Sequence, residues 1–454
     1  MLKPTTLAMI LAGSRVDELN VLTYYRPKSA VPFGGLGRVI DFSLSNLMNS
    51  GIEQVAILSQ YRSYSLINHI GTGAAWDMIG RYRQISILPP FLGSEAADWY
   101  RGPADAIYKN LDYIHYHQPE EILILSGDHI YKMDYQDMID YHTAKNADLT
   151  IAFTRVPRQG ANRFGIAELS DEDGDRGGRV INYWEKPDRP ESDWASMTIL
   201  CFKPEVLYKA LERNQAEGSY HFGKDIIPVL LQQNCRVYGY KFCGYWGYTR
   251  TINEYWQSNI DLLGPEPRID MEKWVFRTNL DHRNIRDYEP ALMTDNAVVQ
   301  NSLIYNGCKI DGTVRNSILF PGVHVKKGAI VDNSVLFFSN MVGENCRFNK
   351  VVADVNTVYG KDVVIGPETC NANTEVTVIG WNNQVPNGTV IGEGATVYPN
   401  LVAKTWPACV QPGRCCDEKG KRSTGSSPCR WRWQSFEYPG AETGQACRTL
   451  RRNL

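Results

Sequence analysis

Between residues 291 and 400, a motif of asparagine, serine and two aliphatic residues recurs at nearly constant spacing. It begins at Asn301 ("NSLIYNGCKI"), Asn316 ("NSILFPGVHV") and Asn333 ("NSVLFFSNMV"), so the spacings are 15 and 17 residues. Glycines and short branched runs recur between the motifs. Such spacings, close to three hexapeptides, are typical of a parallel β-helix in which each coil stacks on its neighbour. The alternative is an antiparallel sandwich of short strands, but the aligned triplets favour the β-helix.

From residue 1 to about 255, short apolar runs alternate with amphipathic stretches. The stretch "RVIDFSLSNLMNSG" has helical spacing and closes on Gly51, a typical helix stop. We expect strands in "TLAMILAG", "QVAILSQ", "EILILSGD" and "DLTIAFTRV". This alternation predicts an α/β fold with a mostly parallel sheet covered by helices on both faces. Ligands of such sheets bind beyond the carboxyl ends of the strands.

Asp128 stands at such a strand end, directly after the apolar run and Ser126-Gly127. Burying a bare carboxylate is costly unless another group compensates its charge. A metal ion, a helix N-terminus or a solvent-facing turn would each account for it. Gly13 and Ser14 occupy the corresponding end of the first expected strand.

Composition limits the class of protein. The 454 residues are 43% hydrophobic and 22% charged, with a net charge of −2, which suits two or three ordinary globular domains. This charge gives no electrostatic reason to expect nucleic acid or an anionic membrane as a partner. No apolar run approaches the ~18 residues of a membrane span. We therefore expect a cytoplasmic protein, with cysteines that are reduced thiols rather than zinc ligands.

An ordered set of motifs carries a resemblance to a known family. The motifs are "LAGSRVDELNVLTYYRPKSAVPFGG", "RGPADAIYKNL", "LSGDHIYKMDY", "RFGIAEL", "YWEKPDRP", "ASMTI", "HFGKDIIP" and "WVFRT", followed by the β-helix. In this order they resemble the ADP-glucose pyrophosphorylases, or glucose-1-phosphate adenylyltransferases, over roughly residues 5 to 400. The resemblance implies a nucleotidyltransferase domain (1–255), a connector (256–290), a left-handed hexapeptide β-helix (291–404) and a tail (405–454).

The resemblance also implies the reaction: glucose 1-phosphate attacks the α-phosphate of ATP, and ADP-glucose and pyrophosphate leave. Because both substrates are polyanions, catalysis is mainly positioning and charge neutralisation, with Mg²⁺ held by carboxylate oxygen. Lys28 would face the transferred phosphates and Asp128 would hold Mg²⁺. Without the resemblance, Lys28 would be a solvated lysine and Asp128 a turn or cap residue. Gly13, Ser14, Gly102, Ala104 and Asp105 would bind the nucleotide, and Tyr100, Gly165, Glu185, Lys186 and Ser196 the sugar phosphate.

Several positions depart from the family pattern. The nucleotide loop usually reads Gly-Gly-x-Gly-Thr-Arg-Leu, but here it is "GSRVDEL", with Glu18 in place of the arginine. Arg15 is a possible substitute for that cation. A second metal-binding aspartate is replaced by Tyr248 in "WGYTRT", and Arg250 is an added cation. A neutral phenol is a poor Mg²⁺ ligand.

Three functions follow as alternatives. The first is an active adenylyltransferase with a rearranged phosphate site, and the second is a catalytically weak regulatory subunit beside a competent partner. The third is an acyltransferase that uses the β-helix, which is the weakest because His324 is the only histidine between residues 291 and 400. We favour the active enzyme, because Lys28, Asp128, Glu185 and Lys186 are all present.

Regulation and assembly are also implied by the resemblance. The family forms homo- or hetero-tetramers and binds an anionic sugar phosphate or phosphate between its domains. Arginines suit that ligand, and the candidates are Arg26, Arg277, Arg283 and Arg286. The alternative is a set of interdomain salt bridges. The basic, cysteine-containing tail has no hydrophobic periodicity, and we expect it to be poorly ordered.

Overall fold

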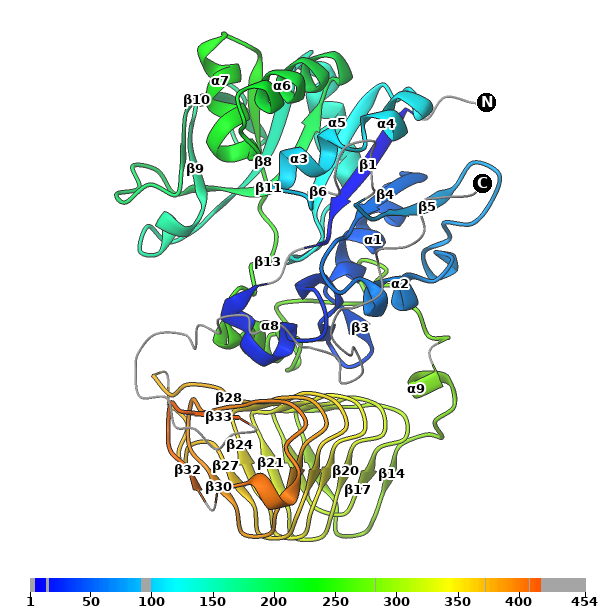
Figure 1. Cartoon of the computed structure of the whole chain (residues 1–454), viewed down its shortest axis with the longest axis vertical. Helices are drawn as coiled ribbons and strands as arrows, with labels where there is room; N and C mark the ends of the chain where they lie inside the picture. The colour runs from blue at the N-terminus through cyan, green and yellow to red at the C-terminus, as the bar shows by residue number, and fades with distance from the viewer. Residues whose placement is uncertain are drawn as a thin grey trace, which may run out of the picture. The chain divides into compact units, whose positions relative to one another are not determined.

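The computed structural model describes residues 5–13, 16–90, 99–281, 283–371, 373–407 and 409–417. Its N-terminal region is built on a nine-stranded sheet with the order β5-β4-β1-β6-β11-β8-β12-β10-β9 (Figure 1). The strands are β1 (Thr6–Leu11), β4 (Gln54–Leu58), β5 (Gln84–Leu88), β6 (Glu121–Ser126), β8 (Leu149–Arg155), β9 (Gly165–Leu169), β10 (Gly177–Glu185), β11 (Trp194–Phe202) and β12 (Val237–Lys241).

The first four strands of that order are parallel, and all four expected strands are present. β1 pairs with β4 and β6, with Ile10 opposite Ile57 and Leu125. Beyond β6 the sheet is mixed, because β11 runs antiparallel to both β6 and β8. The carboxyl ends of β1, β4 and β6 consequently lie side by side at one edge of the sheet.

Alternate residues of the central strands feed two hydrophobic cores, as the continuous apolar runs require. Ala8 and Ile10 face one core, whereas Leu7 and Met9 face the other. The first core contains side chains of α1 (Ile40–Asn49), α2 (Tyr64–Ile70) and α5 (Tyr135–Ala144). The second contains side chains of α3 (Pro103–Tyr108), α4 (Leu111–His117), α6 (Pro204–Ala216) and α7 (Ile227–Gln232). Helices therefore cover both faces, as expected.

Two further helices follow. α8 (Ile252–Ile260) begins with a capping box formed by Thr251 and Glu254, and α9 (Arg283–Arg286) is a single turn. The expected domain boundary at residue 255 falls inside α8 and is therefore too early. Short strand pairs β2 (Pro32–Phe33) with β3 (Gly37–Arg38), and β7 (Ile130–Tyr131) with β13 (Trp246–Gly247), complete this region. Among the described residues, every helix is too short or too polar to cross a membrane.

The C-terminal region is a left-handed parallel β-helix with three ladders (Figure 1). One ladder contains β14 (Leu292–Met293), β17 (Lys309–Ile310), β20 (His324–Val325), β23 (Met341–Val342), β26 (Val358–Tyr359) and β29 (Gln384–Val385). The second contains β15 (Val298–Gln300), β18 (Thr313–Arg315), β21 (Ile330–Asp332), β24 (Arg347–Asn349), β27 (Val364–Ile365), β30 (Val390–Ile391) and β32 (Cys409–Val410). The third contains β16 (Leu303–Ile304), β19 (Ile318–Leu319), β22 (Val335–Leu336), β25 (Val351–Ala353), β28 (Thr377–Ile379), β31 (Thr396–Val397) and β33 (Cys415–Cys416).

The Asn-Ser motifs mark one corner of the coils. Asn301, Asn316 and Asn333 adopt φ of 44°, 45° and 47°, a left-handed conformation that asparagine tolerates better than most residues. The Asn301 amide donates to the Asn316 side chain at 2.9 Å. The serine of each motif receives the backbone N–H of the next, as Ser317 does from Ser334 at 3.0 Å. The repeat therefore encodes both the turn and the stacking of successive coils.

The last strands correct one expectation. β32 pairs with β30 and β33 pairs with β31, so the ladders continue to Cys416 rather than ending at residue 404. Val410 and Cys416 are buried in the β-helix core. The rest of the expected tail, residues 418–454, lies outside the described residues.

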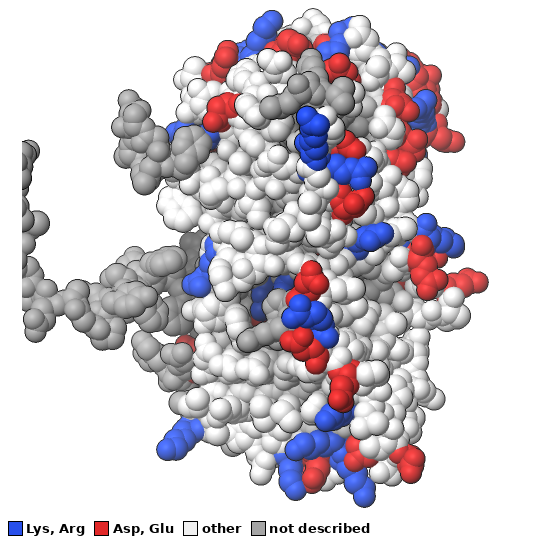
Figure 2. Space-filling model, turned by 90° about the vertical axis from the view of Figure 1, so that its right-hand side faces the viewer, with Lys and Arg blue, Asp and Glu red and all other residues white. Residues whose placement is uncertain are grey.

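One hydrophobic cluster contains residues of both regions. Phe320 and Phe337 of the β-helix join Phe33 and Tyr255, and the Tyr255 and Phe337 rings meet edge to face at 6.2 Å. The Tyr305 hydroxyl donates to the carbonyl of Gly34 at 2.6 Å. On the face drawn in Figure 2, positive and negative side chains are interspersed rather than gathered into a field of one sign.

Candidate active site

The parallel strand ends meet in close backbone contact. After β1, a Cβ on Gly13 would lie 2.7 Å from the backbone nitrogen of Gln60, which follows β4. After β6, a Cβ on Gly127 would lie 2.7 Å from Ile10 Cγ2. Glycine is therefore required at both positions, and the next residue, Asp128, emerges at this edge of the sheet.

Asp128 and Lys28 form the charged centre of this edge. Lys28 Nζ lies 3.4 Å from Asp128 Oδ2, and the other carboxylate oxygen accepts a hydrogen bond from Ser126 Oγ. Burial alone would raise the pKa of Asp128, but the Lys28 and His129 charges and the Ser126 bond lower it to about 2. Burial lowers the pKa of Lys28, and Asp128 opposes that shift. The structure thus brings together two residues that the sequence placed 100 positions apart.

Tyr248 reaches the same centre through its main chain. Its carbonyl accepts a hydrogen bond from Lys28 Nζ at 2.6 Å, and the ammonium lies 5.2 Å from its ring centroid. The ring packs against Phe164 at 4.7 Å and His129 at 5.2 Å. Burial raises the pKa of the Tyr248 phenol, so it stays neutral. This position supplies a carbonyl and an aromatic face in place of the family's carboxylate.

Glu18 and Arg250, the two other departures, are partners. Arg250 Nε donates to Glu18 Oε1 at 2.8 Å, and Arg250 Nη1 donates to the Tyr248 hydroxyl at 3.2 Å. Burial alone would raise the pKa of Glu18, but hydrogen bonds from its backbone and from Arg250 keep it below its usual value. Glu18 is therefore an ionised, paired carboxylate.

Hydrogen bonds and ion pairs fix the segment 99–105, which contains residues expected to bind the nucleotide. The Gln60 side chain accepts from the backbone N–H of Tyr100 at 2.6 Å and donates to its carbonyl at 3.2 Å. Both oxygens of Asp105 are used, by Arg101 at 3.0 Å and Lys109 at 3.2 Å. Asp105 is 1% exposed, so it shapes this segment rather than facing a ligand. The start of α3 packs closely against Tyr220. The N–H of Ala104 donates to the Tyr220 carbonyl at 3.0 Å, and a Cβ on Gly102 would lie 2.4 Å from that same carbonyl oxygen.

Most of the residues expected to bind the sugar phosphate form a second group, around Tyr183 and Glu185. Tyr183 donates to Glu185 Oε2 at 3.1 Å. Gly165 and Gly223 both lie against this pair, because a Cβ on Gly165 would overlap the Tyr183 hydroxyl and one on Gly223 would lie 2.2 Å from Glu185 Oε2. The side chain of Lys186 is exposed, and its backbone has φ of 50°. Ser196 lies on β11 beside an irregularity of the ladder.

Sequence reasoning did not single out Gln60, Tyr183, Gly223 or His129. Gln60 had one signal, its place just after an apolar strand. Ser14 and Arg15, the expected substitute for the missing loop cation, lie outside the described residues.

The four expected effector arginines have different surroundings. Arg26 is buried, with Nη2 2.9 Å from Asp354 of the β-helix, while its Nη1 has no hydrogen-bond partner among the described residues. Arg277 is fixed through its backbone, which accepts from Ser45 Oγ at 3.2 Å. Arg286 is exposed and 3.2 Å from Asp287. The side chain of Arg283 lies outside the described part of the chain.

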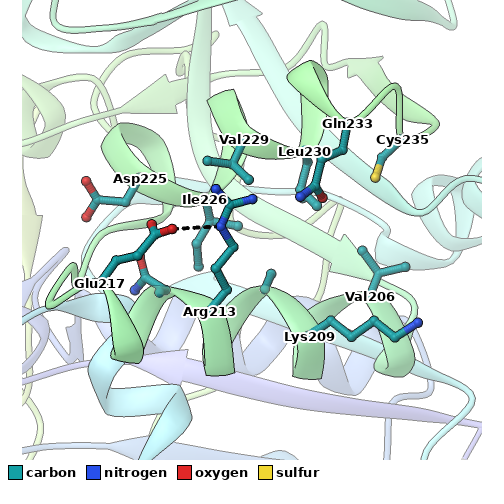
Figure 3. Close-up of a pocket in the computed structure, with 12 residues that line it drawn as sticks. Val206, Lys209, Arg213, Glu217, Asp225, Ile226, Val229, Leu230, Gln233 and Cys235 are labelled. Carbon is teal, nitrogen blue, oxygen red and sulfur yellow. Dashed lines mark hydrogen bonds and ion pairs between the residues drawn. The ribbon is translucent and has the colours of Figure 1, made fainter.

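A separate cavity of about 400 Å³ lies between α6 and α7 (Figure 3). The side chains that line it include Lys209, Arg213, Glu217 and Asp225, and Arg213 Nε donates to Glu217 at 2.8 Å. None of the lining residues is an expected site residue.

Known proteins match this chain over both regions. Residues 7–264 match the Nucleotidyl transferase family, and residues 291–380 match the family of GlmU-like C-terminal hexapeptide sequences. A glucose-1-phosphate adenylyltransferase of Desulfitobacterium hafniense (strain Y51) is 41% identical over 401 residues, covering 87% of this chain and 99% of that protein. Proteins of the same name from Acetivibrio thermocellus and Bacillus cereus (strain ATCC 10987) are 37% and 41% identical, and the alignments cover 90% and 81% of this chain and 96% of each relative.

The chain belongs to the glucose-1-phosphate adenylyltransferase family. The resemblance, the fold class and the nucleotidyltransferase class of enzyme expected from the sequence are thereby confirmed. Nucleotidyltransferases of this family generally use a divalent metal ion. Among the described residues there is no cluster of three or more His, Cys, Asp or Glu side chains able to hold a metal ion by themselves.

Proposed function

We propose that this chain transfers the adenylyl group of ATP to α-D-glucose 1-phosphate, giving ADP-glucose and pyrophosphate for α-glucan synthesis in the cytoplasm. The observation that carries the proposal is the match to 99% of the length of a glucose-1-phosphate adenylyltransferase at 41% identity. The adjacent Lys28 and Asp128 support it, because they stand where a parallel sheet binds ligands.

Lys28 is suited to bring the phosphates to the strand ends. Its ammonium is fixed by Asp128 and by the Tyr248 carbonyl, so it is positioned before any substrate arrives. A preorganised cation stabilises the negative charge that develops on the phosphates in the transition state. Gly13, whose missing Cβ lets the Gln60 backbone pack against it, would contact the nucleotide through its main chain.

Asp128 is the residue that would hold Mg²⁺. Mg²⁺ prefers hard oxygen ligands and is usually bound by one or two carboxylates together with substrate phosphates and water. The Asp128 carboxylate is ionised, sits at the rim and has a side chain 15% exposed, so it fits this mode of binding. When bound, the ion would neutralise charge on the triphosphate.

The sugar phosphate would bind beside Tyr183. Glu185 would accept hydrogen bonds from sugar hydroxyls, and the exposed Lys186 would pair with the phosphate. Gly165 and Gly223 make room for the Tyr183–Glu185 pair itself, because a Cβ at either position would overlap it. Ser196, on β11, would add a hydroxyl to this side.

Pyrophosphate release tests the proposal. The purified full chain is supplied with Mg²⁺, glucose 1-phosphate and ATP, and parallel reactions contain CTP, GTP or UTP, or mannose 1-phosphate. We expect release that requires both glucose 1-phosphate and a nucleoside triphosphate, with ATP the best donor. No release above the reaction without sugar phosphate would contradict an active enzyme.

One observation favours a second candidate, a weak regulatory subunit. The family's loop arginine and second carboxylate are replaced by Glu18, which lies near enough to Lys28 for its pKa to be lowered by that charge, and by Tyr248, whose carbonyl binds Lys28. This candidate predicts that the chain alone binds ATP without turnover and raises the activity of a competent partner when the two are mixed.

Regulation and assembly belong to the same proposal. A tetramer, of identical or different subunits, would bind an anionic sugar phosphate or phosphate near Arg26. The buried, unpartnered Nη1 of Arg26 supports this site, because burying an unsatisfied guanidinium nitrogen is costly unless a ligand completes it.

A further inference from the structure

The Glu18–Arg250 ion pair lies at the edge of the phosphate centre. Arg250 lies near enough to lower the pKa of Lys28 by charge repulsion, and its Nη1 contacts the hydroxyl of Tyr248, whose carbonyl binds Lys28 Nζ. A guanidinium carries five N–H donors, and the bonds to Glu18 and Tyr248 occupy two of them. Arg250 can therefore bind further acceptor oxygens from this position.

The backbone that carries Arg250 is fixed on both sides. Glu254 Oε2 accepts from the backbone N–H groups of Arg250 and Thr251, both at 3.0 Å. The preceding residue, Thr249, is fully buried with φ of 47°, a costly conformation for a β-branched residue. Its Oγ1 has no hydrogen-bond partner among the described residues. Strained backbone of this kind is retained only where the surrounding structure imposes it. The strained Thr249 therefore fixes the backbone from which the Arg250 side chain reaches Glu18.

The ion pair itself is easily opened. The Arg250 and Glu18 side chains are 37% and 44% exposed, and exposed pairs of this kind contribute little to stability. A triphosphate offers more charge than one carboxylate, and a guanidinium binds phosphate oxygens with two parallel hydrogen bonds. An arriving triphosphate would thus displace Glu18 from Arg250 at small cost.

We infer that Arg250 binds the triphosphate of ATP and that Glu18 holds it in the free enzyme as an internal competitor. The inference rests on the proposed function, and it names the residue that supplies the cation missing from the nucleotide loop. Before ATP binds, Glu18 holds the Arg250 guanidinium in place. The triphosphate then replaces Glu18 as the partner of Arg250. The carboxylate then faces solvent, which its exposed position allows.

Four single variants of the full chain test the exchange. Glu18→Gln removes the competing charge, and Arg250→Gln removes the cation. Arg213→Gln and Glu217→Gln are matched controls, because this pair at the C-terminal end of α6 has the same 2.8 Å separation and similar exposure but lines the cavity of Figure 3. Calorimetry measures the Kd for ATP with Mg²⁺, steady-state rates give the KM for each substrate, and Tm reports folding.

The exchange predicts opposite effects at the two positions. Arg250→Gln should raise the Kd and KM for ATP by roughly tenfold or more, as expected for a charge-assisted phosphate contact. Glu18→Gln should lower the Kd for ATP by roughly threefold or more, since the guanidinium no longer has to be released. The KM for glucose 1-phosphate, and all values of the control variants, should stay within about twofold.

An unchanged Kd for ATP in Arg250→Gln would overturn the inference, and so would an equal loss of affinity in Glu18→Gln, which would make the pair purely structural. A wild-type chain that binds no ATP would overturn it as well. A chain that binds ATP with the predicted order of affinities but releases no pyrophosphate would contradict only the proposed function.

Discussion

Substitution of Lys186 tests the proposed binding site for the sugar phosphate. Its side chain is exposed and follows Glu185, whose carboxylate is paired with Tyr183. Lys186→Ala should raise the KM for glucose 1-phosphate about tenfold or more while the KM for ATP changes little, because the lysine would bind the sugar phosphate in ground and transition states alike. Lys209→Ala, on the cavity between α6 and α7, is the control. An equal rise in both KM values would remove Lys186 from the sugar site.

His142 provides a second test at this scale. It is 1% exposed, its Nδ1 lies 2.8 Å from Thr150 Oγ1, and burial, reinforced by Lys203, lowers its pKa to about 4. Its unfolded pKa is about 6.5. The unfolded chain therefore binds the extra proton first, and stability is lost as pH falls from about 6.5 to about 4, by up to roughly 3 kcal/mol.

Urea unfolding at several pH values between 7 and 4.5 measures this loss. His142→Gln should flatten the dependence, whereas His115→Gln, at an exposed position, should not. A slope unchanged in His142→Gln would show that other groups account for the acid sensitivity.

Local sequence predicted where a residue lies when that residue directly follows a strand. Asp128 and Gly13 follow apolar runs, and parallel strands bring such ends to one edge. The partners of Glu18 and Tyr248 could not be predicted, because Arg250 is 232 residues from Glu18 and the contact depends on the conformation of Thr249. Sequence identified these positions as departures without showing that they compensate each other.

At the scale of elements, the end of the β-helix gives a prediction. Val410 of β32 and Cys416 of β33 are buried against the preceding coil. A chain ending at residue 417 should keep its Tm, solubility and oligomeric state. A chain ending at residue 404 should lose roughly 3 kcal/mol of stability, because two buried side chains are removed and the coil beneath is uncovered.

Thermal unfolding and sedimentation of the two truncated chains check this prediction. Equal Tm values would show that the last strands add nothing. The missed coil has a physical cause: the Asn-Ser motif is absent there, and a 3-10 turn at Ala403–Thr405 interrupts the repeat before β32. The earlier coils were predictable because each motif asparagine both forms the turn and hydrogen-bonds to a side chain of the next coil.

At the scale of the whole molecule, Arg26 links the N-terminal region to the β-helix. Its partner Asp354 is 328 residues away, so no local pattern could have revealed the pair. If an anion completes the Arg26 site and the connector arginines assist, phosphate or fructose 1,6-bisphosphate at millimolar concentration should raise Tm saturably by mass action.

Arg283→Ala combined with Arg286→Ala should reduce this shift, and Arg268→Ala, an exposed arginine 3.3 Å from Asp261, should not. Arg26 itself is a poor choice for substitution, because removing one partner of a buried pair costs about 3–5 kcal/mol. A Tm indifferent to the anions, or a full shift in the double variant, would show that Arg283 and Arg286 do not bind the anion.

The proposed adenylyl transfer depends most directly on Asp128, at the carboxyl end of β6. The measurement is ADP-glucose formation from ATP and glucose 1-phosphate by the wild-type chain and by Asp128→Asn, with equal Tm as the check on folding. We expect ADP-glucose from the wild type and a loss of about a thousandfold or more in the variant, since the amide removes the charge that would hold the metal ion. Activity of Asp128→Asn within tenfold of the wild type would show that Asp128 does not hold the metal ion for this reaction.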